Sequence, residues 1–264
     1  MSSLDSIKVF NPLACLNKEE HAKYAVISHN NVNLEHQTIY DLWLNAAYRA
    51  STSSGMEFCN RIRVHQKLFK DLDSEEVRNF APNILVSPPN KKIKPHFKDR
   101  VIYSHSALKG SQALFDELKV CLETVIVEMK GKLESCNGSI VILTDAKCTE
   151  MDFVMFSNLL TNPKITNSLG EVKVYLFCCE SCTFLVPQGK SLICTKNHTD
   201  DVSWCSLVPA SEPARVQTAG LRWDLNNNLL KFGELISTSN KVLHNQDVKL
   251  VTDQQLIFSM GCKY

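Results

Sequence analysis

The chain has 264 residues, a length that suits one large domain or two small ones. Its 29 Lys and Arg balance its 28 Asp and Glu, so it lacks the basic excess that binding to a nucleic-acid backbone requires. The first residues form no secretory leader, and no segment approaches the ~20 apolar residues that span a bilayer. These features argue against nucleic acid and membranes as partners and predict a soluble intracellular protein.

The N-terminal part predicts a tail, a strand and a helix, in that order. Residues 1–21 have little apolar content and are expected to form a flexible tail. The apolar run at residues 24–28 predicts a strand, and apolar residues at helical spacing from Thr38 predict a helix. The Ser- and Gly-rich cluster at residues 51–55 is expected to end that helix.

Residues 82–100 predict a surface loop because consecutive prolines at 88 and 89 donate no backbone hydrogen bonds. The loop carries several basic residues, and two interpretations are open: a docking patch for an acidic partner, or an ordinary solvated loop. The basic residues are Lys91, Lys92, Lys94, Lys98 and Arg100.

The most regular pattern lies at residues 106–145. Apolar residues recur at helical spacing from Leu114 to Leu133, whereas the opposite face carries charged residues that include Glu117. After a break rich in Ser, Asn and Gly, residues 140–143 form a short run that is apolar on both sides. The pattern predicts a long amphipathic helix that leads into a buried strand.

Residues 150–160 predict a short helix that is apolar on nearly all sides. Such a helix usually belongs to the core, but a face rich in Phe and Met also suits a protein interface. Both interpretations remain open.

The rest of the chain predicts strands. The turn at residues 187–190 is expected to join two of them as a hairpin. Helices followed by many strands are typical of an α+β fold with a largely antiparallel sheet. The expected strands cover residues 172–176, 183–186, 191–194, 216–224, 229–236, 248–252 and 256–258.

A group of cysteines and one histidine offers a possible zinc site. Cys179 and Cys182 are spaced as zinc ligands often are, and Cys194 and His198 follow across the expected hairpin. The alternative is that the thiols are buried as small apolar side chains in strands, and a redox role is a third possibility. A zinc-stabilised binding module is therefore the second hypothesis for the function.

No pattern of catalytic residues stands out. The histidines are scattered, and none belongs to a nucleophile, metalloprotease or phosphate-loop motif. We therefore expect no enzymatic activity and no cofactor.

The order of elements resembles the HORMA family. The likeness rests on a first strand and helix at residues 25–49, a central helix at 111–122, a strand at 139–143 and a terminal strand at 254–264. It implies a single HORMA-like domain over residues 22–264, in which a mainly antiparallel sheet is backed by a long central helix and shorter helices.

The resemblance also implies a function. It predicts a non-enzymatic adaptor that binds a closed Mad-two-type HORMA protein and acts with an AAA+ remodelling ATPase to silence the mitotic spindle checkpoint, in the nucleus and cytoplasm. The helix at residues 150–160 would dock on that partner through Phe153, Phe156 and Leu160.

Overall fold

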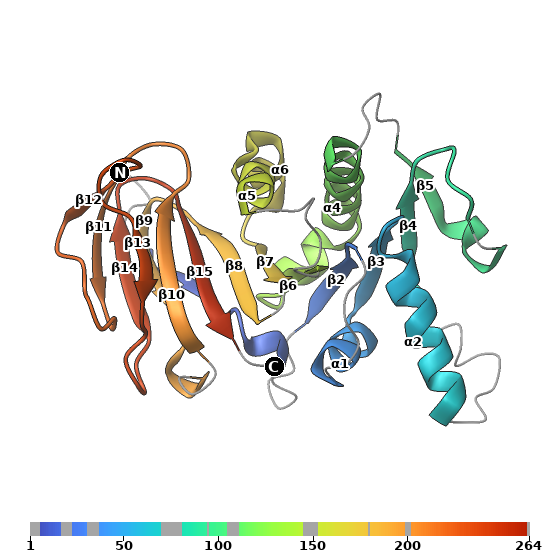
Figure 1. The fold of residues 1–264 in the computed structure, drawn as a ribbon, viewed down its shortest axis with the longest axis horizontal. Helices are drawn as coiled ribbons and strands as arrows, with labels where there is room; N and C mark the ends of the chain where they lie inside the picture. Colours follow the sequence, from blue (N-terminus) through green and yellow to red (C-terminus); the bar gives the residue numbers. More distant parts are fainter. Residues whose placement is uncertain are drawn as a thin grey trace. The chain divides into compact units, whose positions relative to one another are not determined.

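A computed structural model describes residues 6–16, 23–30, 37–69, 81–93, 95–104, 111–144, 153–178, 180–198 and 202–262. The chain divides into two compact units, one formed by Met1–Glu20 with Glu180–Tyr264 and the other by His21–Cys179 (Figure 1). No helix in the described ranges is long and apolar enough to cross a bilayer. We call the two parts the β unit and the α/β unit, respectively.

The α/β unit contains a parallel sheet. Its strands lie in the order β5-β4-β3-β2-β6-β7, and each neighbouring pair runs parallel. The strands are β2 (Tyr24–Ser28), β3 (Tyr48–Thr52), β4 (Ile84–Ser87), β5 (Val101–Tyr103), β6 (Ser139–Thr144) and β7 (Lys173–Cys178).

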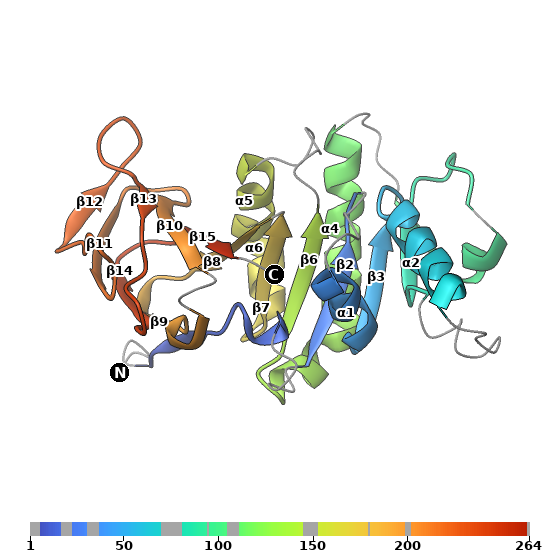
Figure 2. The same ribbon diagram turned by 60° about the horizontal axis from the view of Figure 1, so that its bottom comes forward.

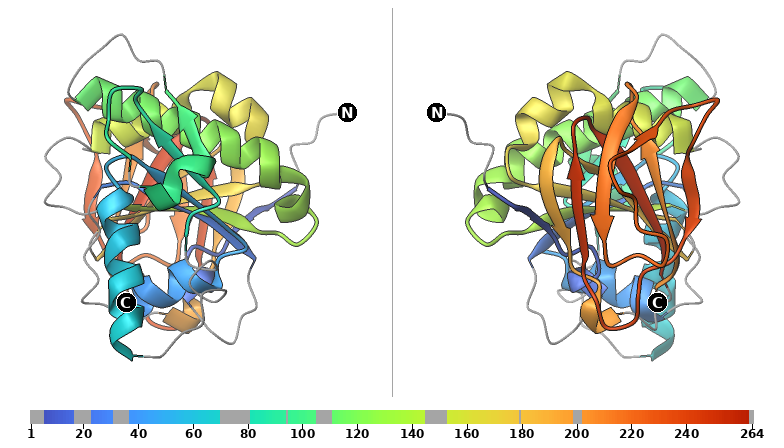
Figure 3. Two further views of the ribbon diagram at one scale, coloured as in Figure 1. Left: turned by 90° about the vertical axis from the view of Figure 1, so that its right-hand side faces the viewer. Right: turned by 90° about the vertical axis from the view of Figure 1, so that its left-hand side faces the viewer.

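Helices cover both faces of this sheet. Figures 1 and 3 show α4, α5 and α6 on one face and α1 and α2 on the other, which makes a three-layer α/β/α arrangement. The helices are α1 (Gln37–Asn45), α2 (Met56–Phe69), α4 (Ser111–Glu134), α5 (Phe153–Thr161) and α6 (Pro163–Leu169), with a 3₁₀ helix η2 (Pro95–Arg100).

The burial of the two central strands, β2 and β6, is typical of a parallel sheet. Every residue of β2 is buried, and all residues of β6 except Ser139 are buried. A strand covered by helices on both faces has no wet side, so its sequence is a continuous apolar run. The expected strands at residues 24–28 and 140–143 are therefore confirmed, and so is the long helix before the second of them.

The β unit consists of two sheets. One has the order β1-β9-β14-β11-β12, and the other includes β13-β10-β15-β8; their strands face the viewer in the right panel of Figure 3. The strands are β1 (Lys8–Phe10), β8 (Ser181–Val186), β9 (Gly189–Ile193), β10 (Val202–Pro209), β11 (Ala214–Ala219), β12 (Asn228–Leu230), β13 (Ser237–Asn240), β14 (Val248–Thr252) and β15 (Leu256–Cys262), with 3₁₀ helices η1 (Ala14–Leu16) and η3 (Lys196–His198).

Aromatic side chains pack between the two sheets. The ring of Phe10 on β1 stacks on that of Phe184 on β8, with centroids 5.3 Å apart, and Phe184 lies 5.4 Å from Phe258 on β15. In β11 buried and exposed residues alternate, as expected for a strand with one wet face. The β unit is therefore a sandwich with its own core.

The expected HORMA-like α+β fold is wrong. The long helix α4 packs on a parallel sheet, and the C-terminal strand β15 pairs with β8 and β10 in the β unit. The expected hairpin at residues 187–190 is also wrong, because β8 pairs with β15 whereas β9 pairs with β1 and β14. The consecutive strands β8, β9 and β10 alternate between the two sheets, whereas β11 and β12 pair within one sheet.

Three local expectations also change. Part of the expected tail at residues 1–21 forms β1, which pairs with β9, and the short helix η1. Residues 51–52, expected to end a helix, belong to strand β3. The expected loop at 82–100 contains the strand β4, whose apolar side chains are largely buried.

Candidate functional site

The first candidate region is the edge of the parallel sheet where the strands end. Strand order reverses between β2 and β6, since the chain moves from β2 through β3 and β4 to β5 and then returns to the other side of β2. In open α/β sheets, ligands bind at such a switch point, beside the carboxyl ends of the strands. Figure 2 shows β6, β2 and β3 ending at this edge, and the His29 N–H donates to the Leu143 carbonyl at 2.8 Å across it.

His29 is the most unusual side chain at this edge. It is fully buried, and its Nδ1 lies 3.1 Å from the Thr52 hydroxyl. Its Nε2 has no hydrogen-bond partner in the described structure, and neither has the buried hydroxyl of Thr144 at the end of β6. Burial lowers the pKa of His29 to about 4, so the ring is neutral near pH 7. Two buried polar atoms at a switch point are suited to hydrogen bonding with a ligand.

The turn between β3 and α2 lies beside His29. Its Gly55 approaches β2 so closely that an added Cβ would lie 2.3 Å from the Ser28 carbonyl oxygen. The Ser54 hydroxyl accepts a hydrogen bond from the Asn30 N–H at 3.2 Å and lies 2.9 Å from the Thr52 hydroxyl. These contacts hold a row of hydroxyl groups at the N-terminus of α2.

Glu117 and Lys91 meet at the same turn. The Glu117 carboxylate, only 3% exposed, accepts a hydrogen bond from the Ser53 N–H at 3.0 Å, and Lys91 donates to the Ser53 hydroxyl at 3.0 Å. Burial raises the pKa of Glu117, whereas the hydrogen bonds from Ser53 and the charge of Lys91 oppose that shift. The helical pattern had placed Glu117 on the wet face of α4, and this assignment is wrong.

The second candidate region is a loop of the β unit that follows β11. Its central residue Asp224 accepts hydrogen bonds from the Thr218 hydroxyl at 2.9 Å and from the Leu221 N–H at 3.0 Å. Asn240 on β13 accepts from the Trp223 N–H at 3.2 Å and donates to the Trp223 carbonyl at 2.8 Å. The loop is therefore fixed by buried and half-buried polar groups on both sides.

This fixed loop presents an aromatic and a cationic side chain to solvent. Trp223 is 54% exposed, and the guanidinium carbon of Arg222 lies 4.9 Å from the centroid of its ring. An exposed indole with one face available is unusual for a folded protein and suits stacking on a flat or cationic ligand. The sequence pattern indicated only a strand at residues 216–224; the Trp-Asp pair after a glycine was the signal for this loop.

The residues expected to bind a HORMA partner lie on α5. Phe156 is fully buried and Leu160 is 2% exposed, so both belong to the core of the α/β unit. The side chain of Phe153 lies outside the described residues. The interpretation of this helix as core therefore fits the structure for the two residues that are described.

The zinc hypothesis is wrong. No cluster of three or more potential metal ligands occurs within the described ranges, which do not include Cys179. Cys182 is fully buried in β8, and burial raises the pKa of its thiol well above the ordinary value, with Cys262 and Cys15 adding to the shift. The buried-thiol interpretation holds for Cys182.

The basic residues at 82–100 do not form one patch. Lys91 contacts Ser53, whereas the Arg100 guanidinium donates to the Pro82 carbonyl at 2.8 Å and thereby ties its own loop. Lys92 and Lys98 are exposed, and Lys94 lies outside the described residues. Among the described basic residues of this loop, Lys91 is the one that donates a hydrogen bond to the turn after β3.

Comparison with known proteins points to thiamin metabolism. The family model described as "Thiamin pyrophosphokinase, vitamin B1 binding domain" matches residues 190–257, which include the Arg222–Trp223 loop. Thiamine pyrophosphokinase 1 of Oryza sativa subsp. japonica is 28% identical over 109 residues, 41% of each chain, and thiamine pyrophosphokinase 1 of Arabidopsis thaliana is 40% identical over 60 residues, 22% of each. Over most of the chain, thiamine pyrophosphokinase 2 of Oryza sativa subsp. japonica is 23% identical across 252 residues, 91% of this chain and 87% of the relative.

Solved structures agree with the sequence matches. Thiamin pyrophosphokinase from Candida albicans superposes with a TM-score of 0.71 at 14% identity, covering 100% of this chain and 96% of the other. The yeast enzyme gives a TM-score of 0.63 at 14% identity, with coverages of 99% and 94%. The chain therefore has the thiamin pyrophosphokinase fold.

These matches overturn the HORMA interpretation and what it implied. The relatives and structural neighbours are thiamin pyrophosphokinases, which are enzymes, so the expectation of a non-enzymatic adaptor is wrong. The expected Mad-two-type partner, the AAA+ ATPase and the role in the spindle checkpoint lose their basis with it.

Proposed function

We propose that this chain is a thiamin pyrophosphokinase, which binds thiamin and transfers the terminal pyrophosphoryl group of a nucleoside triphosphate to the thiamin hydroxyl, with release of the nucleoside monophosphate. One observation carries the proposal: the vitamin B1 binding model matches residues 190–257, and this segment includes the loop that exposes Arg222 and Trp223. The matched segments of the first two relatives span 41% and 22% of their own lengths.

The β unit suits thiamin by its chemistry. Thiamin combines a flat aminopyrimidine with a positively charged thiazolium ring, and an exposed indole can stack on the first or attract the second. Trp223 is held in place by the two hydrogen bonds between its backbone and Asn240. A loop backbone fixed in this way needs little further ordering when a ligand binds.

The α/β unit suits the nucleotide. The switch point between β2 and β6 is the place where open α/β sheets bind ligands, and two unpartnered buried polar atoms of His29 and Thr144 lie there. Each unit therefore offers a region for one of the two substrates.

Thiamin binding by two tryptophan variants tests the proposal. In isothermal titration calorimetry, Trp223→Ala should weaken the binding of thiamin about tenfold, since one aromatic contact with a cation contributes about 1 to 2 kcal/mol. Trp204→Ala is the matched control, because Trp204 is a second exposed tryptophan of the β unit, on β10. Circular dichroism should show both variants folded.

Two outcomes contradict the proposal. Wild-type protein that does not bind thiamin would remove the basis of the function. Equal weakening by the two substitutions would show that Trp223 has no specific part in thiamin recognition, and the proposed site would then be wrong.

A further inference from the structure

The nucleotide region of the α/β unit has an unexpected chemical character. Enzymes that transfer phosphoryl groups ordinarily hold Mg²⁺ through carboxylates beside the phosphates. The described residues at the carboxyl ends of the strands are instead mostly hydroxyl, amide, imidazole and ammonium groups. They are Ser28, His29 and Asn30 after β2, Ser53 and Ser54 after β3, Asn90, Lys91 and Lys92 after β4, Ser104 after β5, and Thr144 on β6.

Glu117 is the carboxylate that α4 brings to this edge, and it does not fit a metal ion. It is 3% exposed, and one of its oxygens accepts the Ser53 N–H at 3.0 Å. The ammonium of Lys91 binds the hydroxyl of the same serine, so a divalent cation at Glu117 would meet a positive charge. Across the described residues no three acidic, histidine or cysteine side chains gather. Asp145, which follows β6 in the sequence, lies outside them.

Lys91 offers what a carboxylate cannot. Its ammonium has three donor hydrogens, one of which is used on the Ser53 hydroxyl, and the side chain is exposed. Next to it lie the Ser54 hydroxyl and the first residues of α2, where backbone N–H groups and the helix dipole favour an anion. The first turn of α2 also carries the carboxylate of Glu57, which accepts a hydrogen bond from the Asn60 amide at 3.4 Å. The buried Nε2 of His29, without a partner among the described residues, lies one strand away and adds a further hydrogen-bonding atom.

We infer that the phosphates of the nucleotide are held at this edge by Lys91 and the hydroxyls of the β3–α2 turn, with no divalent cation held in a carboxylate cage of the described residues. The inference deepens the proposed function and rests on it for the identity of the ligand as a nucleoside triphosphate. A metal ion that accompanies the nucleotide would arrive on its phosphates and find no carboxylate cage among the described residues.

Binding of ATP with and without metal tests the inference. In calorimetry on the full chain, ATP should bind at least as tightly in EDTA as in excess Mg²⁺, because Mg²⁺ neutralises part of the phosphate charge that Lys91 binds and meets no carboxylate cage among the described residues. MnCl₂ titrated alone and followed by electron paramagnetic resonance should show no site on the protein. ATP binding that requires Mg²⁺, or a stoichiometric Mn²⁺ site, would overturn the inference.

Two lysines of residues 82–100 provide the matched variants. Lys91→Gln keeps a donor for Ser53 but removes the charge, and should weaken ATP binding about tenfold in EDTA, as for the loss of one charge-assisted hydrogen bond. Lys98→Gln removes an exposed charge on η2 and should change it less than about twofold. Equal effects of the two variants, or no ATP binding by the wild type, would sink the inference.

Thiamin binding measured on the same samples separates the two claims. If thiamin binds whereas ATP binding depends on Mg²⁺, the inference fails and the proposed function stands. If neither thiamin nor ATP binds, the proposed function fails as well.

Discussion

The buried side chain of His29 should make the stability of the fold depend on pH. Burial lowers the pKa of His29 from 6.5 to about 4. The imidazole is therefore protonated below about pH 6.5 in the unfolded chain, but only near pH 4 in the folded chain. The stability that the neutral ring allows is therefore complete above pH 6.5 and is lost as the pH falls toward 4.

Urea unfolding of wild type and His29→Gln measures this effect. Between pH 7 and pH 5, the wild type should lose about 2 kcal/mol more unfolding free energy than the variant, because only the wild type has this buried base. The comparison cancels other groups that titrate in the same range, including the carboxyl of Glu117, whose pKa is raised. Parallel pH profiles for the two proteins would show that the fold does not lower the pKa of His29.

Two glycines should respond to alanine with opposite signs. In Gly55→Ala the new Cβ would lie 2.3 Å from the Ser28 carbonyl oxygen, a backbone atom that cannot turn away. We expect a loss of about 1 to 3 kcal/mol, as for other overpacked sites. Gly131, on an exposed turn of α4, has no atom within 4 Å of an added Cβ, and Gly131→Ala should gain about 0.5 to 1 kcal/mol.

Thermal or urea unfolding checks both glycine variants in one experiment. A neutral Gly55→Ala would contradict the close approach of the β3–α2 turn to β2. Since that turn holds the hydroxyls near Lys91, the variant should also weaken ATP binding if the inferred phosphate site is correct.

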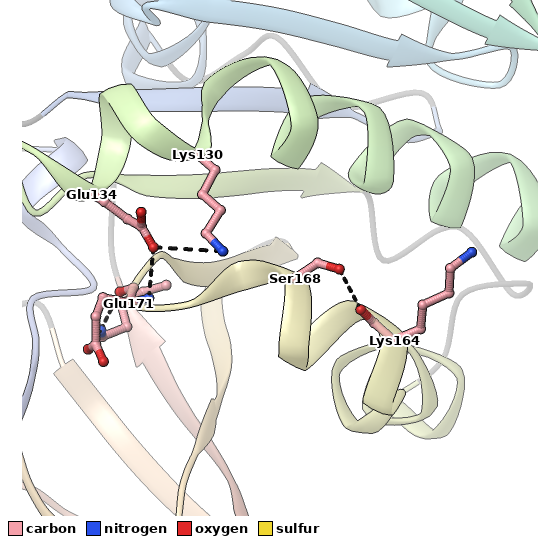
Figure 4. A network of polar contacts seen from close by, with 6 residues as sticks. Lys130, Glu134, Lys164, Ser168 and Glu171 are labelled. Carbon is pink, nitrogen blue, oxygen red and sulfur yellow. Dashed lines mark hydrogen bonds and ion pairs between the residues drawn. The ribbon is translucent and has the colours of Figure 1, made fainter. Parts of the chain in front are cut away.

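At the scale of elements, the end of α4 is tied to the turn between α6 and β7. The Glu134 carboxylate accepts a hydrogen bond from the Glu171 N–H at 3.4 Å and lies 3.9 Å from the Lys130 ammonium (Figure 4). Gly170 has a φ of 61° and leaves room for this carboxylate, since its Cβ would lie 2.3 Å from Glu134 Oε1. The glycine both ends α6 and admits the side chain that fixes the turn.

Removing Glu134 should therefore cost more than removing a nearby acid of the same helix. Glu134→Ala is expected to lower the unfolding free energy by about 0.5 to 1 kcal/mol, because the contacts are half exposed. Glu128→Ala, at an exposed position one and a half turns earlier, should change it by less than about 0.5 kcal/mol. Equal effects in urea unfolding would show that the contacts in Figure 4 do not stabilise the turn.

Long regular elements could be predicted from the sequence. Short elements were missed where one residue type, such as proline, is compatible with both the end and the start of a helix. The stripe from Leu114 to Leu133 predicted a helix that the structure places at Ser111–Glu134. The short helix α6 was not predicted: Asn162 caps its N-terminus and Pro163 occupies its first turn. Proline is favoured there because its missing N–H would have no partner in the helix anyway.

Most of the candidate site could not be predicted from local sequence patterns. Residues 51–55 were expected to end a helix. In the structure they contact Lys91, Glu117 and His29, because β2, β3 and β4 lie side by side in the sheet. Lys91 was singled out in the sequence, but for a surface patch rather than for the edge of a sheet. His29 follows directly after the largely apolar strand β2, and this position indicated a residue of the candidate site.

At the scale of the whole molecule, the expectation of a HORMA fold was wrong because the local sequence does not specify which strands pair or in which direction. A long amphipathic helix followed by an apolar strand fits both an antiparallel HORMA sheet and a parallel α/β sheet. The strand at Tyr24–Ser28 contains the continuous apolar run Ala25–Ile27, which is typical of a parallel sheet covered on both faces. The order of strands within a sheet depends on contacts distant in the chain, so the local pattern left it open.

The central claim is that the chain joins a pyrophosphoryl group to thiamin, and product formation tests it most directly. Purified full-length protein would be incubated with thiamin and ATP, both with Mg²⁺ and in EDTA, and thiamin diphosphate measured by mass spectrometry. The account predicts that thiamin diphosphate accumulates in proportion to protein and time, and that Trp223→Ala slows it. Thiamin that binds but never becomes thiamin diphosphate under either condition would contradict the account.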